Sequence, residues 1–265
     1  MTLKYPCVTA IVNTYNRCGL LPRALDSVLV QAETFNDLEV LVVDDASTDN
    51  TATVIKEYAT KFDAVAIPFI PIGIAENSGA QAVPKNQGII FARGDFIRFL
   101  DDDNEWTPGS LKVLVDAAQE GDVWPDIVYG RRTYVADPGF IQPKNPVFIG
   151  DSSFVEHDPD RLAASPTFNY IDTSDALIAR GAFWWTYHHT NMFWNEDWRR
   201  FGDWELFTRM ANLDKLVGAV PPRFKGIDAV VSIYHWHDVD GGNLQLRRAL
   251  HESPVAKSLT TGEVI

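Results

Sequence analysis

Three short apolar runs in the amino-terminal part of the chain each stop abruptly at polar or acidic side chains. The apolar runs are residues 8–12, 38–43 and 96–100. The polar segments that follow them are residues 13–17, 44–51 and 101–105, respectively. Segments with helical spacing of apolar residues separate the runs. Strands that alternate with helices form a parallel sheet whose ligand site lies outside the carboxyl ends of the strands. We therefore expect Asn13, Asp45 and Asp103 to meet in space.

The rest of the pattern also favours an α/β chain. Apolar residues recur at helical spacing in residues 20–29, 51–58, 85–92, 108–118 and 204–213. A proline-interrupted strand is expected within residues 64–74, and a late strand at residues 230–234. Residues 133–167 are rich in Pro, Asp and Ser and indicate an irregular excursion over the site. These features predict one domain over residues 1–265.

The chain of 265 residues is acidic, with a formal net charge of -13. Nucleic-acid binding relies on clustered Lys and Arg, so no nucleic-acid partner is expected. No window has the length and apolarity of a transmembrane segment, and the amino-terminal residues lack the apolar core of a signal peptide, so we expect a cytoplasmic protein. The two cysteines, Cys7 and Cys18, are not spaced as a redox pair and are expected to be reduced and structural.

The triplet Asp101, Asp102 and Asp103 directly follows the apolar run of residues 96–100. Adjacent carboxylates repel one another, and carboxylates beside a packed strand must be solvated, protonated or neutralised. One interpretation is a solvated loop at the end of a strand, since acidic runs are common in loops. The other is a site for a hard divalent cation, which prefers oxygen ligands and keeps coordination positions open for phosphates.

Several separate motifs, in one order, carry a resemblance to a known family. They are NTYN at residues 13–16, VVDDASTDNT at 42–51, ENSG at 76–79, Lys85-Asn86, LDDDN at 100–104 and GDWEL at 202–206. In this order the sequence resembles the inverting glycosyltransferases of family 2, which have the GT-A (nucleotide-diphospho-sugar transferase) fold. The resemblance covers about residues 7–240. It implies an α/β fold with a Rossmann-like, mostly parallel central sheet flanked by helices.

The resemblance also divides the single domain into parts. It implies a nucleotide-sugar-binding half at about residues 7–130 and an irregular acceptor and catalytic half at about residues 131–240, followed by a tail at residues 241–265. In the family the polar segments after the first two strands hold the nucleoside. The donor is therefore expected to bind in the first half.

Asn13, Thr14 and Asp45 are the residues that the resemblance implies as base and ribose contacts. An Asp suits this task because its carboxylate accepts a hydrogen bond from a pyrimidine N3–H. An alternative for one of the pair Asp44 and Asp45 is to cap the turn near Ser47.

Lys85 matches the family's basic residue near the donor phosphates, and a solvated helix cation is the alternative. The aspartate triplet matches the family's DXD signature. In that signature the last carboxylate, here Asp103, binds Mn²⁺ or Mg²⁺. The resemblance implies that Asp101 and Asp102 contact the ribose or water ligands of the metal.

A late histidine can complete the metal shell in the family, and Tyr234-His235-Trp236-His237 matches that segment. Alternation along a strand puts His235 and His237 on one face and Trp236 on the other. We prefer His237 to His235 as the metal ligand. The alternative is that both are ordinary strand histidines.

Asp203 matches the family's catalytic base at the start of a helix, although Gly202 stands where the family commonly has Glu. The reference pKa of about 4 keeps an Asp ionised at neutral pH, so it can accept the proton of an acceptor hydroxyl. A helix N-cap is the alternative for Asp203, and Glu196 and Asp197 are other candidates for the base. One or two of the tryptophans nearby are expected to line the acceptor site: Trp184, Trp185, Trp194, Trp198 and Trp204.

The resemblance thus implies a metal-dependent, hexosyltransferase-type enzyme that moves a sugar from a UDP- or dTDP-sugar to an acceptor hydroxyl or amine by single displacement. Two alternatives are a nucleotide-sugar-binding relative without transfer activity and a sugar nucleotidyltransferase. The second usually carries a Gly-rich, basic first loop that this sequence lacks. No glycine fingerprint follows either early strand, which excludes a dehydrogenase. The sugar, the oligomeric state and the acceptor, whether a sugar, a lipid-linked or a small molecule, cannot be read from the sequence.

Overall fold

One mixed sheet of nine strands forms the centre of the molecule. The computed structural model describes residues 8–140, 149–164, 169–198 and 202–237. The strands are β1 (Val8–Thr14), β2 (Leu38–Asp44), β3 (Phe69–Gly73), β4 (Phe96–Asp101), β5 (Glu105–Trp106), β6 (Ile127–Ala136), β7 (Gly150–Asp151), β8 (Ala176–Ala179) and β9 (Phe224–Trp236). Their order across the sheet is β3-β2-β1-β4-β8-β6-β9-β5, and β7 pairs with β6.

The first part of the sheet is parallel and the second part is mixed. β1 pairs in parallel with β2 and β4, and β2 pairs in parallel with β3. β8 is antiparallel to β4 and β6, whereas β6 and β9 run parallel to each other. The strand order reverses between β1 and β4, and in open α/β sheets the ligand binds outside the carboxyl ends of the strands at such a point.

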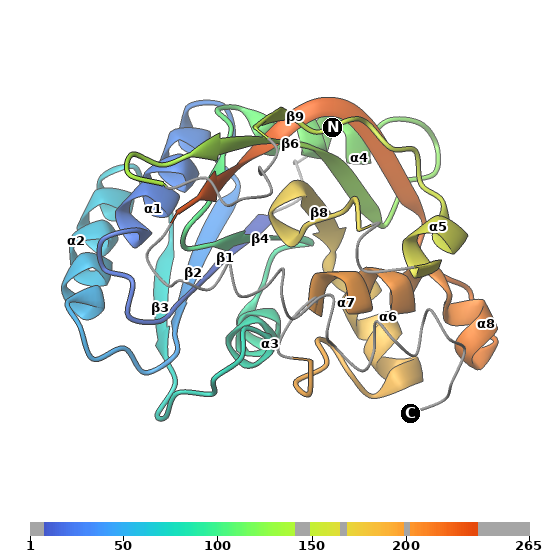
Figure 1. Ribbon diagram of the computed structural model, residues 1–265, viewed down its shortest axis with the longest axis horizontal. Coiled ribbons are helices and arrows are strands. Elements are labelled where there is room, and N and C mark those ends of the chain that lie inside the picture. The colour runs from blue at the N-terminus through green and yellow to red at the C-terminus, as the bar shows by residue number, and fades with distance from the viewer. Residues whose placement is uncertain (1–7, 141–148, 165–168, 199–201, 238–265) are drawn as a thin grey trace.

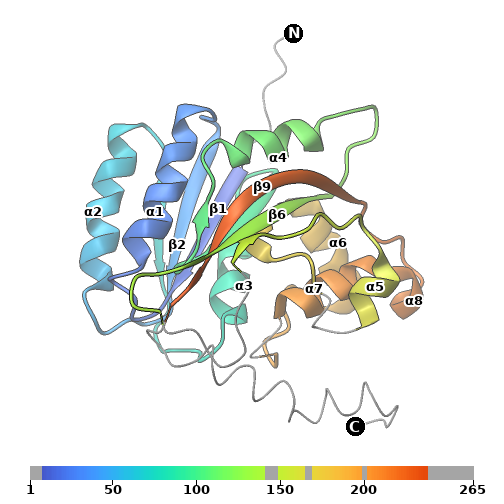
Figure 2. The same ribbon diagram turned by 45° about the horizontal axis from the view of Figure 1, so that its top comes forward.

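Helices cover both faces of the sheet (Figure 1). They are α1 (Leu21–Leu29), α2 (Thr51–Ala64), α3 (Ala82–Phe91), α4 (Ser110–Ala118), α5 (Pro159–Ala164), α6 (Arg180–Thr190), α7 (Gly202–Ala211) and α8 (Leu213–Val217), with the 3-10 turns η1 (Val30–Glu33) and η3 (Thr173–Asp175). One core cluster joins α1, α2 and α4 to the sheet, and the other joins α3, α5, α6 and α7 to its opposite face. Figure 2 shows the long strands β6 and β9 curving side by side between α4 and the group of α5, α6 and α7.

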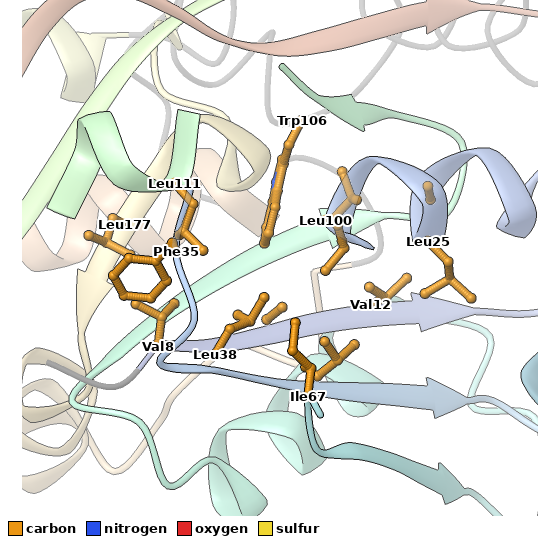
Figure 3. Close-up of a cluster of buried hydrophobic side chains, with 14 of the residues drawn as sticks. Val8, Val12, Leu25, Phe35, Leu38, Ile67, Leu100, Trp106, Leu111 and Leu177 are labelled. Carbon is orange, nitrogen blue, oxygen red and sulfur yellow. The ribbon is translucent and has the colours of Figure 1, made fainter. Parts of the chain in front are cut away.

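Alternate residues of the central strands face the two helical layers. Val8 and Val12 of β1 belong to the cluster on the α1 face, and Ile11 belongs to the cluster on the other face. Figure 3 shows Val8 and Val12 in the first cluster together with Leu25 and Trp106. Full burial of an aliphatic side chain stabilises a fold by about 1.5–3 kcal/mol. Strands buried on both faces therefore appear in the sequence as continuous apolar runs.

The expected α/β architecture is confirmed, but the second half of the chain is more regular than its sequence indicates. β6 extends to Ala136, into the segment for which the sequence predicts irregular structure, because it pairs along its length with β9. β9 itself begins at Phe224, ahead of the predicted start at Val230. The helix predicted over residues 204–213 is divided at Asn212 into α7 and α8.

The first half follows its predicted elements closely. The strand expected within residues 64–74 is β3, which begins at Phe69 because α2 continues to Ala64. α3 begins at Ala82, one turn ahead of the prediction. Cys18 is a free, half-buried thiol. Cys7 and the tail at residues 241–265 lie outside the described residues.

Candidate active site

The polar segments after β1, β2 and β4 meet at one edge of the sheet. Asn13 lies opposite Asp101 in the register of β1 and β4, and the backbone N–H of Asp45 donates to the Thr14 carbonyl at 2.9 Å. Asn13, Thr14 and Asp45 are all buried. Because the triplet continues from Asp101 to Asp103, the expected proximity of the three segments is confirmed.

Asp44 and Asp45 have different partners, which decides which of them caps the turn. Asp44 accepts a hydrogen bond from the Ser47 backbone N–H at 3.0 Å and is therefore the cap. Asp45 instead holds the ENSG loop, since its carboxylate accepts hydrogen bonds from the Asn77 amide at 3.0 Å and the Ser78 hydroxyl at 2.8 Å. Asp45 thus fixes this loop beside β1, where the base contact was expected.

Lys85 is buried in the site and is no solvated helix cation. Its ammonium group lies 3.0 Å from the Asp101 carboxylate and 3.4 Å from the Thr173 hydroxyl. It also lies 4.7 Å from the centre of the Trp194 ring, close enough for a cation–π contact. Lys85 thereby links α3, β4 and the turn η3.

Arg17 is shared by the other two carboxylates of the triplet. Its Nη1 lies 2.8 Å from Asp102 Oδ1 and 2.7 Å from Asp103 Oδ2. On the far side of Asp103, His237 Nε2 lies 3.2 Å from the same Oδ2 atom. The repulsion within the triplet is thus offset by Lys85, Arg17 and His237.

The three carboxyls of the triplet differ in acidity. Burial raises the pKa of Asp102 to about 7 despite the opposing charge of Arg17. Burial also raises the pKa of Asp101, against the charge of Lys85. Burial alone would raise the pKa of Asp103, but the hydrogen bond from His237 and the charge of Arg17 outweigh it and the pKa is lowered. Asp103 is therefore the strongest anion of the three.

His235 and His237 occupy different surroundings. His235 lies between two carboxylates, with Nδ1 2.6 Å from Asp137 and Nε2 2.6 Å from Glu105. The ring of His237 contacts Asp103, and this hydrogen bond raises the pKa of His237. Only His237 of this pair reaches the aspartate triplet in the described contacts, and its role as a metal ligand stays a prediction.

Asp203 is half-buried in the first turn of α7. Asn169 donates a hydrogen bond to Asp203 Oδ2 at 2.8 Å. Burial raises the pKa of Asp203 to about 6, and the nearby charge of Asp172 adds to the rise while Lys85 opposes it. A carboxyl with this pKa is ionised at neutral pH and is a stronger base than an ordinary Asp.

The fallback carboxylate Glu196 and the neighbouring Glu205 are already engaged. Glu196 accepts a hydrogen bond from Asn86 at 2.8 Å, and Glu205 is paired with Arg209 at 2.7 Å. Gly202 lies against Trp194, whose ring would be 3.2 Å from a Cβ at that position. The tight fit explains why a small residue stands before Asp203.

The tryptophans expected near the acceptor do not share one environment. Trp194 and Trp204 are buried, and the Trp204 indole donates to the Leu162 carbonyl at 2.7 Å. Trp184 and Trp185 are exposed on α6. Trp194, through its contact with Lys85, is the member that the described contacts tie to the site.

Sequence reasoning missed a second group of charges on β6 and η3. Arg132 Nη2 lies 2.6 Å from Asp175 Oδ2, and Arg132 Nη1 lies 3.6 Å from Asp172 Oδ2. Arg17 was missed as well. The available signal was the polar turn from Asp172 to Asp175 directly before an apolar run, the same pattern that marks the aspartate triplet.

The family model described as Glycosyl transferase family 2 matches residues 9–199 of this chain. The chain belongs to that family. The putative colanic acid biosynthesis glycosyl transferase WcaA of Escherichia coli (strain K12) is 28% identical over 77% of this chain and 66% of WcaA. The GalNAc(5)-diNAcBac-PP-undecaprenol beta-1,3-glucosyltransferase of Campylobacter jejuni is 36% identical over 44% of this chain and 36% of that protein. This chain thus spans about one to two thirds of the length of these relatives.

Solved structures support the GT-A fold of this family 2 chain. S. aureus TarS superimposes with a TM-score of 0.62 and 19% identity, over 92% of this chain and 39% of TarS. The mannosyltransferase PcManGT from Pyrobaculum calidifontis, solved with GDP-Man and Mn²⁺, gives a TM-score of 0.63 and 19% identity, over 99% of this chain and 67% of PcManGT. No helix among the described residues has the length and apolarity needed to cross a membrane.

The donor atoms at Asp103 and His237 fit the divalent cation that the family 2 fold implies. A carboxylate oxygen and an imidazole nitrogen 3.2 Å apart are both suitable ligands for Mn²⁺. Within the described residues there is no group of three or more His, Cys, Asp or Glu side chains that could hold a metal. The protein would thus supply two ligands and leave the other positions to a diphosphate and water. Arg17 would have to release Asp103 Oδ2.

Proposed function

We propose that this protein is a metal-dependent inverting glycosyltransferase that transfers a sugar from a UDP- or dTDP-sugar to an acceptor hydroxyl or amine. The observation that carries the proposal is the position of Asp203, a carboxylate whose pKa is raised to about 6. The short segment from Asn169 to Thr173 connects it to the aspartate triplet. Asn169 binds Asp203, and Thr173 binds Lys85 beside Asp101. One end of the site thus suits a phosphate and cation, and the other suits proton removal.

The nucleotide is assigned to the edge formed by β1, β2 and β4. Asn13, Thr14 and Asp45 lie where the base and ribose would bind, and Asp101 and Asp102 continue the same edge toward the diphosphate. Asp103 and His237 would hold Mn²⁺ or Mg²⁺, which, when bound, offsets the charge that builds on the leaving diphosphate. Lys85 holds the carboxylate of Asp101 in place at 3.0 Å.

Asp203 is assigned as the general base. Its carboxylate accepts the proton of the acceptor hydroxyl or amine as that oxygen or nitrogen bonds to the anomeric carbon. The bond from the anomeric carbon to the diphosphate oxygen breaks in the same displacement, so the configuration inverts. The Asn169 side chain donates to Oδ2 and thereby orients the carboxylate of Asp203.

The names of relatives support a sugar nucleotide as donor and suggest a large acceptor. TarS was solved in complex with UDP and with UDP-GlcNAc. One relative is a poly(ribitol-phosphate) beta-glucosyltransferase, 32% identical over 58% of this chain and 22% of that protein. PcManGT was solved with GDP-Man, so GDP-sugars belong in any donor screen.

A donor screen by thermal shift tests the proposal. UDP-, dTDP- and GDP-sugars are added with Mn²⁺, and a ligand at 100 times its Kd is expected to stabilise the protein by about 2.7 kcal/mol. The best donor is then incubated with the protein and Mn²⁺, and release of the nucleoside diphosphate is measured. Slow hydrolysis of the donor supports a transferase. Binding without any release, with or without sugar acceptors, would leave a binding protein, and release of pyrophosphate from a nucleoside triphosphate would indicate a nucleotidyltransferase.

A further inference from the structure

The segment of residues 169–175 spans the site from the base to the aspartate triplet. At one end, the Asn169 amide donates to Asp203 Oδ2 at 2.8 Å. At the other end, the Thr173 hydroxyl lies 3.4 Å from the Lys85 ammonium, which is paired with Asp101 at 3.0 Å. A residue between Asn169 and Thr173 is therefore placed between the leaving diphosphate and the acceptor, where the transferred sugar must lie.

Asp172 occupies that position, and among the described residues only its Oδ1 accepts a hydrogen bond within the fold. Oδ1 accepts a hydrogen bond from the Ser174 backbone N–H at 2.9 Å and caps η3. Oδ2 lies 3.6 Å from Arg132 Nη1, which is longer than a hydrogen bond. Oδ2 thus keeps the capacity to accept hydrogen bonds from a ligand.

Arg132 is fixed in a way that leaves Nη1 beside Asp172. Its Nη2 is held by Asp175 Oδ2 at 2.6 Å, and Asp175 is itself buried. The side chains of Arg132 and Asp172 are 11% and 16% exposed, so a ligand can reach them without unfolding the turn. An acceptor oxygen and a donor nitrogen 3.6 Å apart match two neighbouring hydroxyl groups, one of which donates and the other of which accepts.

We propose that Asp172 Oδ2 and Arg132 Nη1 bind two neighbouring hydroxyl groups of the transferred sugar, an inference that rests on the proposed function. Asp172 is then a specificity-determining residue, and the enzyme prefers donors whose sugar has a free vicinal diol. The nucleotide part of the donor lies beyond Lys85 and does not contact this pair.

The charge of Asp172 supports a role beyond the cap. Burial raises the pKa of Asp203, and the charge of Asp172 is the next contribution to that rise. Asp172 likewise adds to the rise in the pKa of Asp101 that burial causes. An Asn at position 172 would cap η3 about as well without repelling two site carboxylates. Within the fold the charge of Asp172 faces Arg132 at 3.6 Å, and Arg132 already has Asp175 as a closer partner at 2.6 Å, so sugar hydroxyls give a further reason for a carboxylate here.

Asp172→Asn tests the inference because it keeps the cap and removes the charge. Calorimetry with Mn²⁺ compares three pairs of probes, UDP with UDP-glucose, dTDP with dTDP-glucose, and GDP with GDP-mannose. We expect the affinity for the bare nucleotide to stay within about twofold and that for the best nucleotide sugar to fall about 10- to 100-fold, as for the loss of hydrogen bonds to a charged group. The variant should also keep its transfer rate to lower pH. Without the charge of Asp172, the charges of Lys85 and Arg132 lower the pKa of Asp203 unopposed by that charge.

Asp228→Asn is the matched control, since Asp228 is exposed and is paired with Arg131 at 2.6 Å, next to Arg132 in sequence. This control should change neither affinity. Equal losses for nucleotide and nucleotide sugar in Asp172→Asn, or no loss for either, would overturn the inference while the proposed function stands. A parent protein that binds each nucleotide sugar no better than its nucleotide would also overturn it. A parent protein that binds none of the six probes would instead remove the proposed function.

Discussion

Two arginines, one in each half of the molecule, lie among carboxylates but differ in how firmly they are held. Arg17 follows β1 and has one guanidinium nitrogen between Asp102 and Asp103, with 24% of its side chain exposed. Arg132 lies within β6, is 11% exposed, and holds Asp175, whose side chain is 1% exposed. The first arginine sits at the rim of the sheet and the second is enclosed by it.

This difference separates an arginine that can change its partners from an arginine that stabilises the fold. Burial raises the pKa of Asp102 to about 7, so this carboxyl can take up a proton if Arg17 moves away. Asp175 accepts further hydrogen bonds from Ser232 and from the backbone of Asp172, so it joins β6, β9 and η3. We infer that ligands displace Arg17, whereas Arg132 stays in place and presents its free side to them.

The largest expected effect concerns Asp203, the proposed general base in the second half. Asp203→Asn keeps the shape and removes the basicity, so transfer should fall on the order of 10²- to 10⁴-fold. Donor affinity should change little, because the nucleotide contacts lie at the other end of the site. Steady-state kinetics with the best donor, together with calorimetry, separates the two quantities.

Asn caps a helix about as well as Asp, so a residue that is only a cap would give a variant with parental activity and melting temperature. Near-parental turnover would therefore refute the role of Asp203. The search for the base would then move to Glu196 or Asp197.

A matched pair of substitutions tests the comparison of the two arginines directly. Arg132→Met leaves Asp175 buried without its partner and should lower the free energy of unfolding by about 3–5 kcal/mol. Arg17→Met should cost less, about 1 kcal/mol, because the arginine is partly exposed and the buried Asp102, with a pKa of about 7, can take up a proton when its partner is lost. Urea denaturation of both variants gives the two values. Similar losses in the two variants would show that both arginines hold the fold.

The third effect concerns the cation at Asp103. Asp103→Ala removes the strongest anion of the triplet, and the Mn²⁺-dependent part of nucleotide binding should weaken by about tenfold or more, equivalent to about 1.4 kcal/mol. Calorimetry with UDP or dTDP in the presence and absence of Mn²⁺ measures this. Unchanged affinity for both nucleotide and Mn²⁺ would make the assignment wrong.

The two histidines provide the internal control for that experiment. His237→Ala should reduce Mn²⁺ affinity because its ring contacts Asp103 at 3.2 Å. His235→Ala should leave Mn²⁺ affinity unchanged and lower the melting temperature, because it leaves Asp137 and Glu105 without their shared partner. Reversed results would make His235 the ligand.

The sequence was sufficient for the first half because its signals are local. Asn13, Asp45 and the aspartate triplet each follow an apolar run within the same few residues, and parallel strands place such ends at one edge. The burial of Lys85 could not be predicted from the sequence, because this burial involves Trp194, which is more than a hundred residues away along the chain.

The second half depends on contacts between distant segments. β6 pairs with β9 about a hundred residues later, and its outer half has no clear alternation of apolar and polar side chains. Arg132 is therefore indistinguishable from a surface arginine in the sequence, and Asp172 from a turn residue. Their ion pair forms only when β6 and η3 come together. Local motifs thus predicted the edge to which we assign the nucleotide, and only the three-dimensional arrangement revealed Asp172 and Arg132, the pair for which we propose sugar binding.

The smallest expected effect is the pH dependence of transfer. Because burial raises the pKa of Asp203 to about 6, the base is mostly ionised at pH 7 and mostly protonated at pH 5. The rate should fall about tenfold from its plateau by pH 5, one decade for each pH unit below the pKa. An ordinary Asp, with a pKa near 4, would keep most of its activity at that pH.

Unfolding caused by the titration of Asp203 cannot account for such a fall in rate. A carboxyl whose pKa is higher in the folded than in the unfolded state binds its proton more tightly when folded, so its contribution to stability grows as the pH drops from above 6 toward 4. The melting temperature should therefore not decline between pH 7 and pH 5 on account of Asp203, while the rate does. Nucleotide affinity, measured over the same range, isolates changes at the triplet, where Asp102 has a pKa of about 7. A rate that stays flat down to pH 5, at saturating donor and Mn²⁺, would place the base on an ordinary, exposed carboxylate and contradict the assignment of Asp203.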